Sequence, residues 1–337
     1  MISVNDIWIE LTDEGCPKTG FLRRRIPMSN GVNIFAVILS PLGLPALLME
    51  VDTKTTNDTF DIECFGFNLK TLTRKDAVMG LVRCIVLELS DNKYRDIFNV
   101  VADDVVSNVA KEADEIHGIV TFTNQIMKWK NFFNKYGVKG LSKQLQHGLW
   151  GELWVIKSIL SPIWGIDNSI VSWVGPNGAN QDFSNELACI EVKTSISPPH
   201  KKFVVSNVLQ LIGYPDIKMF LVFVALDVRR SRIGSLPQLV NEIRETLDNT
   251  NPQVLSLFNS KLIRYGYLDM HEQKYLNTGY HVRNSILFKV VDGFPRILED
   301  DIPNGVGDLR YSVSVSSCLN FIVETTELSD SIRVSNT

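Results

Sequence analysis

The sequence predicts a mixed α/β (α+β) protein, and three observations predict it. Short runs rich in Val, Ile and Phe, broken by Gly, Pro, Asn and Asp, fill the stretch from Trp8 to about Thr73, which is typical of an antiparallel sheet. From Tyr94 to about Tyr136 the apolar period lengthens to helical spacing. Further along, the elements run helix, three strands, helix, strand. We therefore expect a β-rich and then helical region over 1–136, a core over 137–232 and an α+β extension over 233–337.

The N-terminal region contains one apolar run, Val32 to Val51, that is long enough to raise the question of a membrane span. Pro41, Gly43 and Pro45 interrupt it, so two strands joined by a turn are expected instead. Eight acids and three bases lie between Glu88 and Glu115, which argues against DNA contact there and is explained by solvated helix faces. Arg23-Arg24-Arg25 is a candidate contact for nucleic acid.

Charge and cysteine content exclude several classes of protein. The net charge of −4 excludes a histone-like protein that binds polyanions through its overall charge. The cysteines are too widely spaced for a zinc knuckle or a dense disulfide framework, so reduced thiols are expected. The polar start Met-Ile-Ser-Val-Asn-Asp does not resemble a signal peptide, and a cytoplasmic protein without a membrane segment is expected.

The central and C-terminal elements follow from apolar spacing. One helix is expected over Leu141–Leu160, with Ser142 near its start. The remaining elements are strands over Ile170–Val174, Asn180–Phe183 and Leu187–Thr194, a Ser206-led helix to Leu211, a strand over Phe220–Leu226, a helix over Leu236–Leu247, and a second small sheet containing Ile286–Val291 and Tyr311–Val315.

Glu152 falls near the middle of the apolar arc of the first of these helices. A buried carboxylate without a partner costs several kcal/mol, so Glu152 must be paired, protonated or bound to a cation, a structural ion pair being the non-functional alternative. Gly148 and Gly151 lie just before it, and each costs about 1 kcal/mol of helix stability relative to alanine. Close approach of another backbone would explain both glycines.

A predicted hairpin carries two further acids. In the strand Leu187–Thr194, alternation sends Ala188, Ile190 and Val192 to one face and Cys189, Glu191 and Lys193 to the other. A turn at Ser184-Asn185-Glu186 brings Asp182 across to Glu191. Two carboxylates that meet repel each other unless a cation intervenes, and an all-oxygen site suits Mg²⁺ or Mn²⁺.

The pattern Asp182…Glu191-Val192-Lys193 in this order of elements resembles the PD-(D/E)XK nuclease superfamily. The finer pattern is similar to the bacterial "PD-(D/E)XK motif protein" family, which is encoded beside DNA methyltransferases and ATPases in restriction and phage-defence loci. It comprises Gly148-Leu149-Trp150-Gly151-Glu152-Leu153, Trp173-Val174-Gly175-Pro176, Asp182-Phe183, Glu191-Val192-Lys193-Thr194 and Gln210-Leu211, with Trp129 upstream and Phe294-Pro295-Arg296 downstream. In one departure, Gln181 precedes the aspartate where the superfamily has proline.

The resemblance implies a restriction-endonuclease-like αβββαβ core with a mixed central sheet, and a Mg²⁺- or Mn²⁺-dependent DNA endonuclease. Asp182, Glu191 and the carbonyl of Val192 are then metal ligands, and Lys193 orients or deprotonates the attacking water. Glu152 would hold a metal-bound water or a second cation. Gln210 would orient Lys193 or the scissile phosphate, its alternative being a helix-surface glutamine.

Basic residues gather around the predicted core. Seven bases and two acids lie between Val192 and Arg232, which favours contact with a phosphate backbone, a solvated loop being the alternative. The candidate contacts are Lys201, Lys202, Arg229, Arg230 and Arg232.

Several readings stay open. A non-cleaving DNA-binding or scaffold subunit of a defence complex, and a nuclease acting on RNA or on structured or single-stranded DNA, are the alternatives. Cleavage of both strands favours a homodimer, and the gene neighbourhood of the family implies ATPase or methyltransferase partners. His147 is expected to be structural, Cys189 to line the site, and Trp150 and Trp154 to pack against the N-terminal region.

Overall fold

The computed structural model describes residues 3–15, 18–51, 59–76, 80–137, 139–196, 202–214 and 216–332, and the chain forms two compact units, residues 1–139 and 140–337. The first unit contains α1 (Val4–Asp13), β1 (Phe21–Ile26), β2 (Asn33–Leu39), β3 (Leu44–Val51), β4 (Asp61–Cys64), β5 (Phe67–Asp76), β6 (Gly80–Leu89), η1 (Asn92–Tyr94), α2 (Arg95–Val109) and α3 (Glu115–Tyr136). Within the described residues, no helix is long and apolar enough to cross a membrane.

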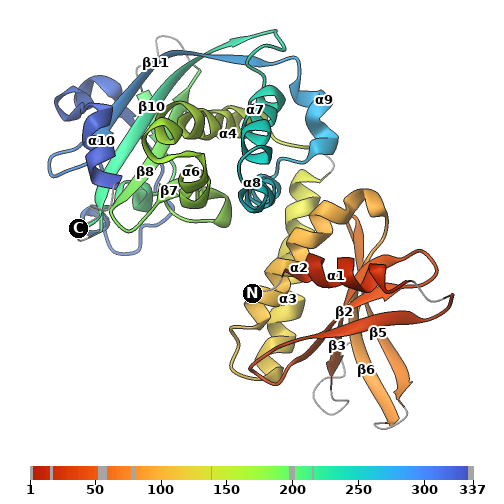
Figure 1. Cartoon of the computed structure of the whole chain (residues 1–337). Coiled ribbons are helices and arrows are strands. Elements are labelled where there is room, and N and C mark those ends of the chain that lie inside the picture. The colour runs from red at the N-terminus through yellow and green to blue at the C-terminus, as the bar shows by residue number, and fades with distance from the viewer. Residues whose placement is uncertain are drawn as a thin grey trace. The chain divides into compact units, whose positions relative to one another are not determined.

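The first unit is an antiparallel sheet with helices packed on one face (Figure 1). Its strand order is β1-β2-β3-β6-β5-β4, and the expected pair of strands in the run Val32–Val51 is confirmed as β2 and β3. On the helical face, Trp8 of α1 stacks on Phe98 of α2, with ring centroids 5.3 Å apart. The prediction that strands begin at Trp8 is wrong: Ser3 caps a helix there, and Trp8 and Leu11 on one side of it are buried.

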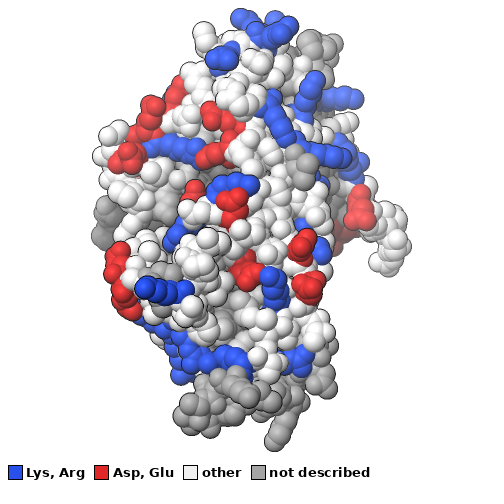
Figure 2. All heavy atoms as spheres, turned by 90° about the vertical axis from the view of Figure 1, so that its right-hand side faces the viewer, with Lys and Arg blue, Asp and Glu red and all other residues white. Residues whose placement is uncertain are grey.

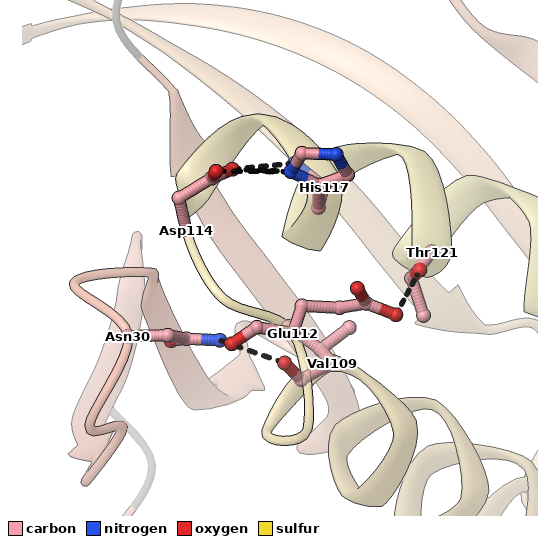
Figure 3. Close-up of polar contacts among 6 residues, drawn as sticks. All are labelled: Asn30, Val109, Glu112, Asp114, His117 and Thr121. Atoms are coloured by element: carbon pink, nitrogen blue, oxygen red, sulfur yellow. Dashed lines mark hydrogen bonds and ion pairs between the residues drawn. The ribbon is translucent and has the colours of Figure 1, made fainter.

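Several acids between Glu88 and Glu115 do not only face solvent, as expected, but accept hydrogen bonds within the first unit. Asp114 caps α3 by accepting from the backbone N–H of His117, and the carboxylate of Glu112 accepts from the Thr121 hydroxyl (Figure 3). Asp103 accepts from the N–H of Val4, and Asp104 accepts from the Trp129 indole. Two arginines of the run 23–25 form ion pairs, Arg23 with Glu50 and Arg24 with Glu10 and Glu14, and Arg25 is exposed.

The second unit is built on a four-stranded sheet. Its elements are α4 (Lys143–Val155), η2 (Ile156–Leu160), α5 (Ser161–Trp164), α6 (Ile166–Ser172), η3 (Gly175–Asn177), β7 (Phe183–Ser184), β8 (Ala188–Ser195), β9 (Lys202–Val205), η4 (Val208–Leu211), β10 (Lys218–Arg229), α7 (Leu236–Asp248), α8 (Pro252–Tyr265), η5 (Asp269–His271), α9 (Glu272–Tyr275), β11 (Gly279–Lys289), η6 (Glu299–Asp301), β12 (Tyr311–Ser314), η7 (Val315–Phe321) and α10 (Thr325–Ile332). The strand order is β11-β10-β8-β7, with β8 and β10 parallel and both edge strands antiparallel, so the sheet is mixed.

Each face of this sheet has its own core. Ile190 and Val192 pack with α4, α7 and α8, which lie together on one side in Figure 1. Cys189 packs on the other side with Phe203 of β9 and with residues of β10 and β12. The alternation expected along Leu187–Thr194 is therefore confirmed.

The extension expected over 233–337 shares the sheet and the cores of this unit. Ile286–Val291 does not start a second sheet, because β11 pairs along β10, and only Tyr311–Ser314 pairs elsewhere, with β9. The helix expected at Leu236 is α7, and α8 was not foreseen.

The strand expected over Ile170–Val174 is wrong. These residues close helix α6, in which Ile170 is fully buried and Val171 is 56% exposed, and only Trp173 bridges to Phe183. The helix ends against Lys261 of α8, whose ammonium group donates to the carbonyls of Ile170, Val171 and Trp173 at 2.6–2.9 Å. A cation at a helix C-terminus binds the carbonyls that have no partner within the helix, and this stabilises α6 against the β propensity of its residues.

Candidate active site

The hairpin β7–β8 brings two carboxylates together. Asn185 forms its turn by accepting from the N–H groups of Leu187 and Ala188. Phe183 pairs with Ile190, and the same register sets Asp182 opposite Glu191. One oxygen of Asp182, Oδ2, accepts from the N–H of Val192 at 2.7 Å.

Lys193 lies beside Glu191 on the same strand face. Its Nζ is 2.6 Å from Glu191 Oε1 and donates to Gln210 Oε1 at 2.8 Å, where Gln210 also accepts from the N–H of Ser206. Gln210 lies on a short 3₁₀ helix capped by Asn207, in place of the expected Ser206-led helix. The structure therefore joins Asp182, Glu191, Lys193 and Gln210 in one group.

This group is short of positive charge. Burial raises the pKa of Asp182 to about 6, with Lys193 opposing the shift. Burial, followed by the nearby charge of Asp182, holds the pKa of Glu191 well above its ordinary value. Glu191 Oε2 is buried without a hydrogen-bond partner. A single lysine does not satisfy two buried carboxylates.

The donor atoms fit a hard divalent cation. Asp182 and Glu191 offer carboxylate oxygens, one of them the unpartnered Oε2. The N–H and the carbonyl of Val192 point to the same edge of β8, the edge that faces β7. Because β7 has only two residues, paired with Ile190 and Cys189, the Val192 carbonyl has no strand partner at this edge. Among the described residues, no three His, Cys, Asp or Glu side chains are close enough to hold a metal ion by themselves. A metal site here therefore needs the Val192 carbonyl as a third ligand.

Glu152 is buried against Trp173 and Tyr265. It is 6% exposed on α4, as its place in the apolar arc predicts. Its oxygens accept from Trp173 Nε1 at 2.7 Å and from the Tyr265 hydroxyl at 3.1 Å, and the expected alternative of an ion pair is not seen among the described residues. Burial first, and the charge of Asp182 second, raise the pKa of Glu152 well above its ordinary value.

Side chains, not another backbone, approach the two glycines of α4. A Cβ on Gly151 would lie 2.2 Å from Thr194 Cγ2, and one on Gly148 would lie 3.1 Å from the Tyr265 hydroxyl. His147 Nδ1 is 2.9 Å from Thr194 Oγ1, and burial lowers the pKa of the imidazole. These contacts fix how closely α4, and Glu152 with it, packs on β8.

Of the candidate basic contacts, the arginines lie apart from this group. Lys201 falls outside the described residues, and Lys202 is exposed at the start of β9. Arg229, Arg230 and Arg232 are exposed at and just beyond the end of β10. Phe223 is in register with Lys193, so Arg229 lies six residues, or about 20 Å, further along the strand.

Three expectations around the site need correction. Cys189 does not line it, because the side chain is 2% exposed within the second core. The Trp150 ring packs at a tilt against Tyr280 of the same unit, with ring centroids 5.7 Å apart. Together with Trp154 it lines a cavity of about 260 Å³ between α4, α7 and β11. Both contacts lie within the second unit.

Sequence reasoning missed Tyr265 and Lys261, the residues of α8 that reach Glu152 and Trp173. Asn251 and Pro252 were the available signal, since an Asn cap followed by a proline is a typical helix start, and Phe258 and Leu262 follow at helical spacing. The contact of Lys261 with Trp173 joins residues 88 positions apart, and that of Tyr265 with Glu152 joins residues 113 positions apart. Contacts at such separations leave no local pattern in the sequence.

A carboxylate pair and a lysine on a hairpin in a mixed sheet, with a buried glutamate on the earlier helix α4, define a protein of the PD-(D/E)XK class. A family model described as "Putative PD-(D/E)XK family member, (DUF4420)" matches residues 4–316, and the chain belongs to that family. The family is one of nuclease-like proteins. Neither the curated proteins nor the solved structures gave a match to this chain.

Proposed function

We propose that this protein is a metal-dependent endonuclease that hydrolyses DNA phosphodiester bonds in a bacterial restriction or anti-phage defence system. The observation that supports the proposal best is the buried, unpartnered Oε2 of Glu191 beside Asp182 and the Lys193–Gln210 pair. Family membership supports the class of reaction.

Asp182, Glu191 and the carbonyl of Val192 would hold Mg²⁺ or Mn²⁺. A divalent cation bound there supplies Lewis acidity and neutralises charge that develops on the phosphate. Lys193 is held by Glu191 and Gln210, and the N–H donor that these contacts leave would orient the attacking water and stabilise negative charge. Glu152 would hold a second cation or a water from the helix side.

DNA would approach through local positive patches. Figure 2 shows acidic and basic side chains interspersed over the middle of the face that it draws, so that area offers no field of one sign. Lys202 and the arginines at the end of β10 are the proposed phosphate contacts, and binding should weaken as salt rises. A homodimer, and ATPase or methyltransferase partners, are part of the proposal.

The test is cleavage of methylated and unmethylated DNA by purified protein with Mg²⁺ or Mn²⁺. We expect Asp182→Ala and Lys193→Ala to abolish cleavage, while the exposed controls Asp248→Ala and Lys143→Ala retain it. RNA and single-stranded DNA are assayed alongside. Cleavage that survives both site substitutions contradicts the proposal. A folded, metal-binding protein that cuts none of these substrates favours the scaffold subunit.

A further inference from the structure

Gln210 sits on η4, a helix of four residues whose own hydrogen bonds are few. Its Oε1 accepts from Lys193 Nζ at 2.8 Å and from the N–H of Ser206 at 3.0 Å. The position of η4 therefore decides where the lysine is held. Something other than the helix itself must fix it.

Two side chains from distant segments bind the end of η4. Gln181 Nε2 donates to the carbonyl of Leu209 at 2.7 Å, with the carbonyl of Ile212 3.5 Å away. Arg296 Nη1 donates to the carbonyl of Leu211 at 2.6 Å. The carbonyl of Leu209 accepts only the long bond from the N–H of Ile212 (3.3 Å) within this segment, and the last carbonyls of a helix lack intrahelical partners, so these donors tie η4 to two other parts of the unit.

Both donors are themselves held in place. Gln181 is 4% exposed and directly precedes Asp182. Near Arg296, Phe294 is buried edge-on against Phe288 and Phe321, at centroid distances of 6.3 and 5.2 Å. Ile297 donates its N–H to the Tyr311 hydroxyl at 3.2 Å. In the segment Phe294-Pro295-Arg296, Phe294 therefore packs into the core and Arg296 donates to η4.

We infer that Gln181 and Arg296 are positioning residues, which clamp η4 so that Gln210 holds Lys193 against Glu191. The inference rests on the proposed nuclease function. It also accounts for the glutamine found where the superfamily has proline, because proline has no side-chain donor that could reach the carbonyls of η4.

The first experiment measures single-turnover cleavage and DNA affinity of Gln181→Met and Arg296→Met. Arg296→Lys keeps a donor and should restore part of the rate. Gln253→Met and Arg310→Met replace exposed residues of the same types as controls. We expect the cleavage rate to fall about 10- to 100-fold in the two clamp variants, as for other supporting residues of active sites, with DNA affinity unchanged. Equal losses in the controls would overturn the inference.

A mutant cycle separates positioning from general support. If Gln181 acts through Gln210, then Gln181→Met should change the rate little in a Gln210→Leu background, because the group that it positions is gone. Fully additive losses would overturn the inference.

Hydrogen exchange gives a readout that needs no cleavage. The amide protons of Ser206, Gln210 and Ile212 should exchange faster in both clamp variants, with those of β8 and α4 unchanged. Unchanged exchange at η4 overturns the clamp. If the wild-type protein cuts no nucleic acid, the proposed function fails, and the exchange result still decides whether the clamp exists. Faster exchange with a wild-type rate of cleavage overturns the positioning role alone.

Discussion

Lys261 is a buried lysine that binds the C-terminal end of α6. It is 4% exposed and donates to three carbonyls at the end of α6, including that of Trp173, whose indole donates to Glu152. Phe258, one turn earlier on α8, packs against Trp173 at a centroid distance of 6.0 Å. One face of α8 therefore sets the position of the buried glutamate.

Burial lowers the pKa of Lys261 to about 8, which has a consequence for stability. The unfolded chain keeps the proton until about pH 10.4, so between these values the unfolded state binds more protons. The free energy of unfolding should therefore rise with pH from about 8 to 10, as the buried charge is relieved. Urea titrations across this range should show the rise in the wild type and a flatter profile in Lys261→Met. A wild-type profile that falls throughout would contradict the assignment.

A divalent cation should stabilise the folded protein because it relieves the repulsion between Asp182 and Glu191. At a concentration 100 times its dissociation constant, the gain is about 2.7 kcal/mol. We expect Mn²⁺ to raise Tm in the wild type and in Asp248→Ala, but not in Asp182→Ala. An equal rise in all three would place the ion elsewhere.

Among the elements, α4 depends on a glycine for its close approach to β8. Gly151 faces Thr194, and the space between them does not accommodate a methyl group. Thr194 also contacts His147 of the same helix through its hydroxyl. These contacts fix the position of α4 so that Glu152 accepts from Trp173 and Tyr265.

Gly151→Ala should destabilise the protein although alanine favours helix by about 1 kcal/mol. Overpacking against Thr194 costs about 1–3 kcal/mol and should dominate. Thr194→Ser removes the clashing methyl group but keeps the hydroxyl that faces His147, so the double variant should recover most of the loss. Chemical denaturation of the four proteins tests this, and additive effects would show that the contact is not the cause.

Local patterns allowed much of the core to be predicted from the sequence. Alternation gave the faces of β8, and the turn at Asn185 gave the pairing of Asp182 with Glu191. The strand expected at Ile170 failed because a lysine 91 residues later stabilises a helix there. Tyr265 and Arg296 were missed as site contributors for the same reason: their hydrogen bonds join segments whose proximity no local spacing encodes.

At the scale of the molecule, the segments after residue 232 are part of the cores and the sheet of the second unit. Leu239, Val240 and Ile243 of α7 and Phe258 and Leu262 of α8 are buried in the same core as Ile190 and Val192. β11 pairs along β10 within the same sheet.

A fragment of residues 140–337 should therefore unfold cooperatively, whereas the motif-bearing fragment 137–232 should not. The shorter piece keeps α4 but lacks α7, α8 and β11, so it exposes part of the apolar core on each face of its sheet. Calorimetry or urea denaturation followed by near-UV circular dichroism compares the two. A sharp transition in the fragment 137–232 would show that the later segments are dispensable for folding.

The clamp on η4 also bears on when the site can form during synthesis. Arg296 is added 114 residues after Asp182, which takes roughly 6 to 23 seconds at the usual 5–20 residues per second. Until then Leu211 lacks one of the donors that hold η4. A chain still on the ribosome, or one cut short before Arg296, carries every residue of the carboxylate–lysine group without the completed support, so a nuclease built this way would stay restrained until Arg296 has been added and has folded onto η4.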